Sequence, residues 1–197
     1  MTIDDLKPQV DAAFAVTGAG TPGWPDPHPD RRPGEEEYSR CLDPAKYRIL
    51  GARVEAWQEV LVRRALMTTL EADGAVWWRP TRAGALPLRV SRLPVDRVAD
   101  AGVTIAAGDP ARVLESVPDC GCDACDSGSA NDLAVLDGLI AVVLAGGVVR
   151  VAHGGHVVRR TVDGWSASGP PDRDLPRRWL GGDVPDGADV VQGEPWF

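Results

Sequence analysis

Three of the four cysteines of this chain fall within six positions, at Cys120, Cys122 and Cys125. The thiolate is the form that binds zinc, and the Cys-x-x-Cys spacing of Cys122 and Cys125 lets both sulfurs reach one tetrahedral ion at about 2.3 Å. Cys120 adds a third sulfur, and Gly121 relaxes the steric limits on the backbone between the first two. The segment therefore predicts a zinc-binding loop.

The predicted ligand set is incomplete, because a closed structural zinc site takes four protein ligands. The remaining cysteine, Cys41, is the candidate fourth ligand. Further candidates by chemistry are His28, His153, His156, Asp123 and Asp126. Two other interpretations stay open: unreactive or occasionally oxidised thiols, and a redox dithiol at Cys122 and Cys125. The aspartates beside the sulfurs disfavour a free thiolate, which argues against the dithiol and for a bound cation.

Composition and charge narrow the class of protein. A chain of 197 residues with 44% hydrophobic content can bury one substantial core, so we expect one main folded domain. The net charge is −8 and the basic residues are scattered, so we expect no nucleic-acid partner. The scarcity of lysine and the abundance of Ala, Gly, Val, Pro and Asp are typical of GC-rich bacterial genomes.

The same sequence lacks signals for export or membrane insertion. Residues 1–6 have neither the basic nor the apolar region of a secretory signal. The longest apolar run, residues 138–149, is too short to span a bilayer. We therefore expect a cytoplasmic protein with no membrane segment, where thiols stay reduced and clustered cysteines bind metal or react more often than they form disulfides.

Helical periodicity is clearest in two segments. In the first, Asp43 suits the N-cap, Pro44 suits the first helical position, and apolar residues recur at three and four positions as far as about Arg64. The second runs from Ser129 to Ala145 and is ended by two glycines. A shorter helix is expected over residues 2–16, followed by a proline-rich connector in which His28 is expected to be solvated.

Period-two patterning predicts the strands. Residues 66–72 and 75–79 flank Asp73-Gly74 and predict a hairpin. Two more strands are expected near residues 86–90 and 103–107, with an irregular link over 94–101. Residues 110–117 read as a short helix or a strand. A second hairpin, over residues 148–152 and 157–162, would place His153 and His156 opposite each other across Gly154-Gly155.

These elements predict an α+β fold in which an antiparallel sheet of roughly four to six strands packs against two main helices. Three regions follow from the composition. They are an N-terminal helix with its proline-rich connector (1–34), an α+β domain with the three-cysteine loop (35–165), and a Pro/Gly-rich tail containing tryptophan (166–197). The tryptophans of the C-terminal part, Trp165, Trp179 and Trp196, predict that this part lies along the domain.

The cysteine segment, continued by Asp126, Ser127 and Gly128, resembles an uncharacterised bacterial family, a domain of unknown function, as does the segment from Asp43 to Arg48. The resemblance covers about residues 35–165. It implies no activity, and the shared pattern has no cysteine at the position of Cys41.

The sequence contains no glycine-rich phosphate loop, nucleophile elbow or His-Glu zinc helix. We therefore expect a non-enzymatic cytoplasmic protein whose cysteine loop binds structural zinc and which acts through an unknown protein partner. One alternative is a zinc hydrolase in which Cys120, Cys122 and Cys125 share the ion with His153 or His156. Another is an acidic immunity-type or regulatory protein that binds a basic partner.

Overall fold

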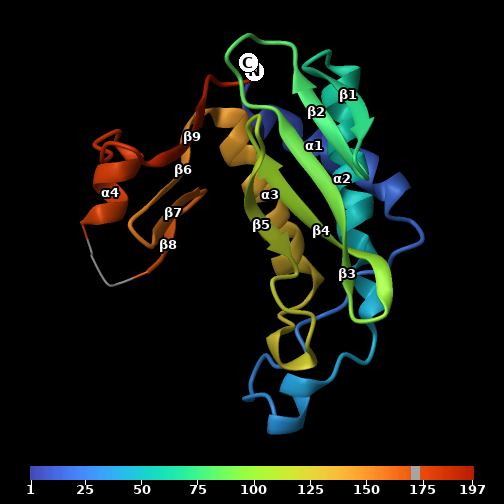
Figure 1. Cartoon of the computed structure of the whole chain (residues 1–197). Coiled ribbons are helices and arrows are strands. Elements are labelled where there is room, and N and C mark those ends of the chain that lie inside the picture. Colours follow the sequence, from blue (N-terminus) through green and yellow to red (C-terminus); the bar gives the residue numbers. More distant parts are fainter. Residues whose placement is uncertain (170–173) are drawn as a thin grey trace.

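The structure is a computed structural model that describes residues 1–169 and 174–197. Within these residues four α-helices and nine strands form an α+β fold (Figure 1). The predicted class is confirmed. The strands form two antiparallel sheets, with five strands in one and four in the other.

The five-stranded sheet is a meander in the order β1-β2-β3-β4-β5. Its strands are β1 (Met67–Ala72), β2 (Ala75–Pro80), β3 (Leu88–Val95), β4 (Val98–Ala107) and β5 (Arg112–Val117). The predicted hairpin is present, with Asp73 and Gly74 both at positive φ in its turn. Of the two interpretations left open for residues 110–117, the structure has the strand.

The irregular link predicted over residues 94–101 is wrong, because β3 and β4 continue into it and meet in a tight turn at Asp96-Arg97. Asp96 has a φ of 49°, which aspartate tolerates better than most residues. Pro94 lies where the register shifts between Leu93 and Val95. A bulge is one of the few places where a strand accepts proline, so the pattern looked broken where the strand continues.

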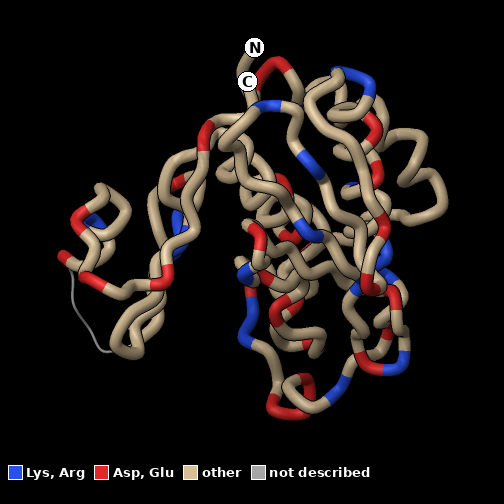
Figure 2. Tube along the Cα trace, turned by 45° about the horizontal axis from the view of Figure 1, so that its top comes forward, with Lys and Arg blue, Asp and Glu red and all other residues tan. Residues whose placement is uncertain are grey.

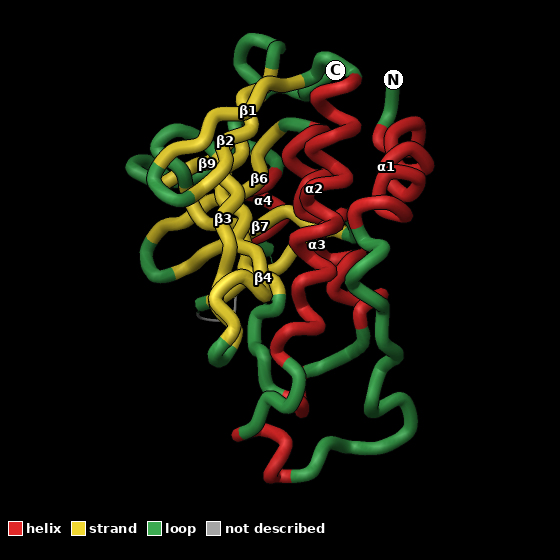
Figure 3. Tube along the Cα trace, turned by 90° about the vertical axis from the view of Figure 1, so that its right-hand side faces the viewer, coloured by secondary structure: helices red, strands yellow, loops and turns green. Residues whose placement is uncertain are grey.

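The helices lie together on one side of the first sheet (Figure 3). They are α1 (Ile3–Thr17), α2 (Arg48–Arg63) and α3 (Ser129–Ala145), and α2 is preceded by a 3₁₀ turn, η2 (Pro44–Tyr47). Thr2 caps α1 through a reciprocal capping box with Asp5. Trp57 of α2, Trp78 of β2 and Leu136 of α3 are fully buried where helices and sheet meet.

The four-stranded sheet has the order β8-β7-β6-β9 and stands to the left in Figure 1. It comprises β6 (Gly147–His153), β7 (His156–Thr161), β8 (Gly164–Ser168) and β9 (Asp189–Gly193), with helix α4 (Leu175–Leu180) packed on it. Trp179 and three valines form its small apolar core. The predicted hairpin is confirmed, including the pairing of His153 with His156.

In the described residues the C-terminal part packs in two places: α4 lies on the second sheet, and Trp196 lies against the main domain. Trp179 and Trp196 are buried, whereas Trp165 is 45% exposed. The indole Nε1 of Trp196 donates to the carbonyl oxygen of Leu86 at 3.1 Å, and its backbone N–H donates to the carbonyl of Leu144 at 2.9 Å. Residue 196 therefore joins the start of β3 to the end of α3.

Charged residues of both signs are dispersed along the fold (Figure 2). In the part of the chain that the structure describes, no helix combines the length and the apolar character needed to cross a bilayer.

Candidate metal centre

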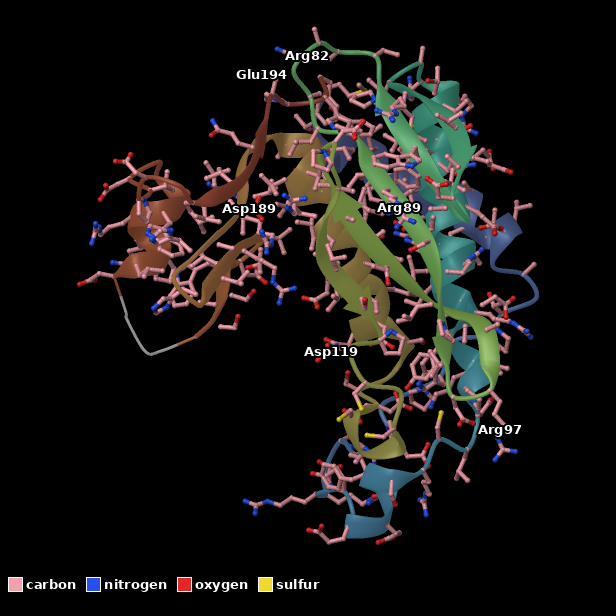
Figure 4. All side chains as sticks on the ribbon, viewed as in Figure 1. Arg82, Arg89, Arg97, Asp119, Asp189 and Glu194 are labelled. Atoms are coloured by element: carbon pink, nitrogen blue, oxygen red, sulfur yellow. The ribbon has the colours of Figure 1, made fainter. Side chains whose placement is uncertain are left out.

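The three clustered cysteines lie in the loop between β5 and α3, and their sulfur atoms are within 4.8 Å of one another. The Sγ atoms of Cys120 and Cys122 are 3.2 Å apart. Cys122 is half-buried, and Cys120 and Cys125 are exposed. Figure 4 shows sulfur atoms near the labelled Asp119, at the end of the molecule away from Arg82 and Glu194. The predicted grouping of three sulfurs is thus present.

Two glycines, Gly121 and Gly128, give the cysteine loop a backbone path that residues with a side chain would obstruct. A Cβ on Gly121 would lie 2.3 Å from a methyl carbon of Val95, so only glycine passes this strand without a shift. Gly128 has a φ of 84°, and a Cβ there would lie 2.6 Å from the backbone nitrogen of Asp26. A substitution at Gly128 would be strained and would also collide with backbone. Both glycines of the motif therefore set the shape of the loop.

Asp126 is a buried anchor of the loop. Its carboxylate accepts hydrogen bonds from the indole of Trp24 at 2.8 and 3.1 Å and from the backbone N–H of Gly128 at 2.9 Å. It also forms an ion pair with Lys46, whose ammonium lies over the Trp24 ring. Burial opposes ionisation of Asp126, but these donors outweigh it and lower its pKa. The residue fastens the cysteine loop to the N-terminal connector and to η2.

Asp123 fastens the same loop to the segment before η2. Its carboxylate accepts from Arg40 Nε at 2.8 Å and from the backbone N–H of Leu42 at 3.1 Å. The backbone N–H of Asp123 in turn donates to the carbonyl of Arg40 at 2.9 Å. Both candidate carboxylate ligands of the motif are therefore occupied by hydrogen bonds to residues far away in the sequence.

Cys41 lies inside the segment that Asp123 holds, although it is not in the group of three sulfurs. It lines a cavity of about 470 Å³ together with Gly121 and Cys122. Burial, and then the charge of Asp123, raise the pKa of the Cys41 thiol. Its chain neighbours Arg40 and Leu42 are both tied to Asp123, so Cys41 is held close to the loop.

The pKa values of the Cys122 and Cys125 thiols are shifted in opposite directions. Burial opposes ionisation of Cys122, but hydrogen bonds from the Cys120 and Cys125 thiols and from backbone amides outweigh it and lower the pKa of Cys122. The interaction with Cys122 is the main reason why the pKa of Cys125 is raised to about 12. Cys125 therefore keeps its proton near neutral pH unless a cation displaces it, as a coordinating metal does.

The histidines lie outside the sulfur group. The expectation that His28 is solvated is wrong: its side chain is only 7% exposed, and its Nε2 lies 3.3 Å from Glu37 Oε2. The connector folds back over η1 (Glu35–Ser39), where Arg31 binds Glu37 through two hydrogen bonds, and so covers the ring. His153 and His156 belong to the second sheet, and both rings contact the ring of Trp179 edge-on.

Sequence reasoning missed a cavity of about 370 Å³ beside the cysteines, lined by Cys120, Cys125 and Asp132 among others. Burial, and then the negative charge of Asp126, raise the pKa of Asp132 to about 6. In the sequence Asp132 is an ordinary first-turn aspartate of α3. Only the folded loop, which places Asp126 nearby, marks it as unusual.

A family model described as a family of unknown function (DUF6226) matches residues 10–197. The match extends beyond residues 35–165 to most of the connector and to the whole C-terminal part. Searches among curated proteins and among solved structures returned no match.

Proposed function

The chain belongs to the family of unknown function DUF6226, which prescribes no activity, so we propose from the site alone that Cys120, Cys122 and Cys125 bind a structural zinc ion. One observation carries the proposal: three sulfurs lie within 4.8 Å of one another in the structure. Thiolates are soft ligands that suit zinc, and a tetrahedral ion accommodates three of them at once.

Cys41 is the fourth ligand of the proposed site. The hydrogen bonds of Asp123 to Arg40 and Leu42 keep Cys41 beside the loop, and Cys41 shares a cavity with Cys122. A small shift of either segment would then complete a four-sulfur shell. Such a closed shell would join residues about 80 positions apart, so the ion would contribute folding free energy directly.

The proposed role is non-enzymatic, with a cytoplasmic protein partner still to be identified. A closed zinc shell leaves no position for a substrate water. The zinc hydrolase with His153 or His156 has less support. Both imidazole rings contact Trp179 in the second sheet, and neither belongs to the sulfur group. The net charge of −8 supports the immunity-type or regulatory alternative, in which the partner is basic.

The test is metal analysis of protein purified without a histidine tag, with Cys122→Ser, Cys41→Ser and Ser39→Ala in parallel. We expect about one equivalent of zinc in the wild type and the Ser39→Ala control, and less zinc with a lower melting temperature in both cysteine variants. Two results together would contradict the proposal: wild-type protein that contains no metal, and a melting temperature that Cys122→Ser leaves unchanged. Full zinc content in Cys41→Ser alone would remove only the fourth ligand.

A further inference from the structure

A continuous groove runs along α3, starting at the cysteine loop. The 370 Å³ cavity beside Cys120 and Cys125 and a second cavity of about 280 Å³ have Glu115, Asn131 and Val135 in common, so they adjoin. The second cavity continues along α3 and reaches the turn between β7 and β8. The labelled Asp119 marks the cysteine end of the groove (Figure 4).

The groove contains a carboxylate that lacks a donor. Within the described residues, no hydrogen bond or ion pair to the Asp132 side chain is formed, although burial and the nearby Asp126 charge make its ionisation unfavourable. Most carboxylates in comparable surroundings gain a donor that offsets desolvation. Asp132 faces a cavity, so a donor carried by a ligand can reach it.

The other charges of the groove leave it negative. Arg159 forms an ion pair with the Glu115 carboxylate and donates a hydrogen bond to the carbonyl of Leu114. Arg160, further along, donates to two backbone carbonyls. Asp119 lies at one end of the groove and Asp163 at the other. A ligand that matches this pattern carries positive charge at both ends.

The middle of the groove is apolar. Val135 is 41% exposed, and Leu139 follows it one turn later on the same face of the helix. From Asp132 to Leu139 the helix rises by about 10 Å. An aliphatic chain laid over these two residues would remove apolar surface from water, whereas a compact cation would not.

We propose that this groove binds a linear aliphatic amine, with one ammonium group at Asp132, the methylene chain over Val135 and Leu139, and another ammonium group toward Asp163. The length of the apolar segment matches an extended diamine with about eight methylene groups, such as 1,8-diaminooctane, which has no charge in its middle. Amine binding in this groove requires no metal at the cysteines, so it can be tested separately from the zinc site.

The experiment is calorimetric titration of the full chain with 1,8-diaminooctane at low ionic strength. Four variants are compared with the wild type: Asp132→Asn, Val135→Arg, Asp186→Asn and Cys122→Ser. We expect Asp132→Asn to weaken binding by about tenfold or more, since it removes the counter-charge of the buried ammonium. Val135→Arg should abolish binding, because it fills the groove and adds a positive charge.

Asp186→Asn is the matched control, since it makes the same change in charge at an exposed residue that does not line the groove. Equal affinities for Asp132→Asn and Asp186→Asn would overturn the proposal and show attraction to net charge alone. Absence of 1,8-diaminooctane binding to the wild type would overturn it as well. Retained binding in Cys122→Ser protein that has lost its metal would support the amine site separately from the zinc site.

Discussion

The indole nitrogen of Trp24 donates to both carboxylate oxygens of Asp126, 102 residues further along the chain. The backbone of Trp24 also binds the start of α3. Its N–H donates to Ser129 Oγ at 3.0 Å, and its carbonyl accepts from the Ser129 hydroxyl at 3.0 Å. The proline-rich connector is thus part of the cysteine site. Its tryptophan fastens the C-terminal end of the loop through Asp126 and Ser129.

Replacing Asp126 by Ala should destabilise the protein strongly. The change leaves the Lys46 ammonium and the Trp24 indole N–H buried without their acceptor, a situation that typically costs about 3 to 5 kcal/mol in the free energy of unfolding. Trp24→Phe removes one donor and keeps the carboxylate paired, so it should cost only about 1 to 2 kcal/mol. Urea denaturation of both variants measures the difference. Equal losses would show that Asp126 acts only through Trp24.

The pKa of Asp132 predicts a stability change with pH. Folding raises this pKa from its ordinary value to about 6, so the folded state binds the proton more tightly than the unfolded state. The resulting stabilisation is complete below the unfolded pKa and is lost as pH rises through the folded pKa. Asp132→Asn should therefore be more stable than the wild type at pH 7, by about 1 kcal/mol after allowance for solvent in the cavity, and no more stable near pH 4.

Thermal denaturation of the two proteins across this range measures the effect. A constant difference between wild type and Asp132→Asn at every pH would contradict it. The comparison also supports the amine experiment, because a variant that is more stable at neutral pH cannot lose its ligand through unfolding.

Replacing both His153 and His156 by Ala should change little. Both residues flank a glycine turn, and within the described residues neither side chain forms a hydrogen bond or an ion pair, so we expect a loss of stability of about 0.5 kcal/mol or less, as for most surface changes. Zinc content should stay at the wild-type level. Loss of the ion in the double variant, measured by metal analysis beside Cys125→Ser, would instead place an imidazole in the metal site and restore the hydrolase.

The elements of the fold were predictable where a local rule sufficed. Periodicity and the two glycine-containing turns indicated both main helices and both hairpins, because these signals act within a few residues. The predicted start of the first main helix was wrong: Asp43 forms no capping hydrogen bond through its side chain, and α2 begins at Arg48 after the 3₁₀ turn η2. Trp57 is one of the apolar residues that recur in the first main helix and is fully buried, but no pattern in the sequence indicated its hydrogen bond to Asp137 at 2.6 Å. Such a partner is chosen by tertiary packing across 80 residues, which no local pattern encodes.

The site was predictable to the same extent. The spacing of Cys120, Cys122 and Cys125 made three sulfurs adjacent, since a short loop brings neighbours together whatever surrounds it. The aspartates of the motif were considered as metal ligands. In the structure Asp126 instead accepts a hydrogen bond from Trp24 of the connector, and Asp123 accepts one from Arg40. The division of the strands into two sheets also depends on a remote pairing, that of β6 with β9.

Trp196 has a consequence for the order in which the chain can assemble. Its indole and backbone hold Leu86 and Leu144, yet it is synthesised about 110 and 50 residues after them. While the chain is being made, both main helices and the whole first sheet are available, but the place of this ring beside them stays empty. The contacts that join the start of β3 to the end of α3 through this ring therefore cannot form until residue 196 has been synthesised, and until then apolar surface beside the ring stays open to chaperones and proteases.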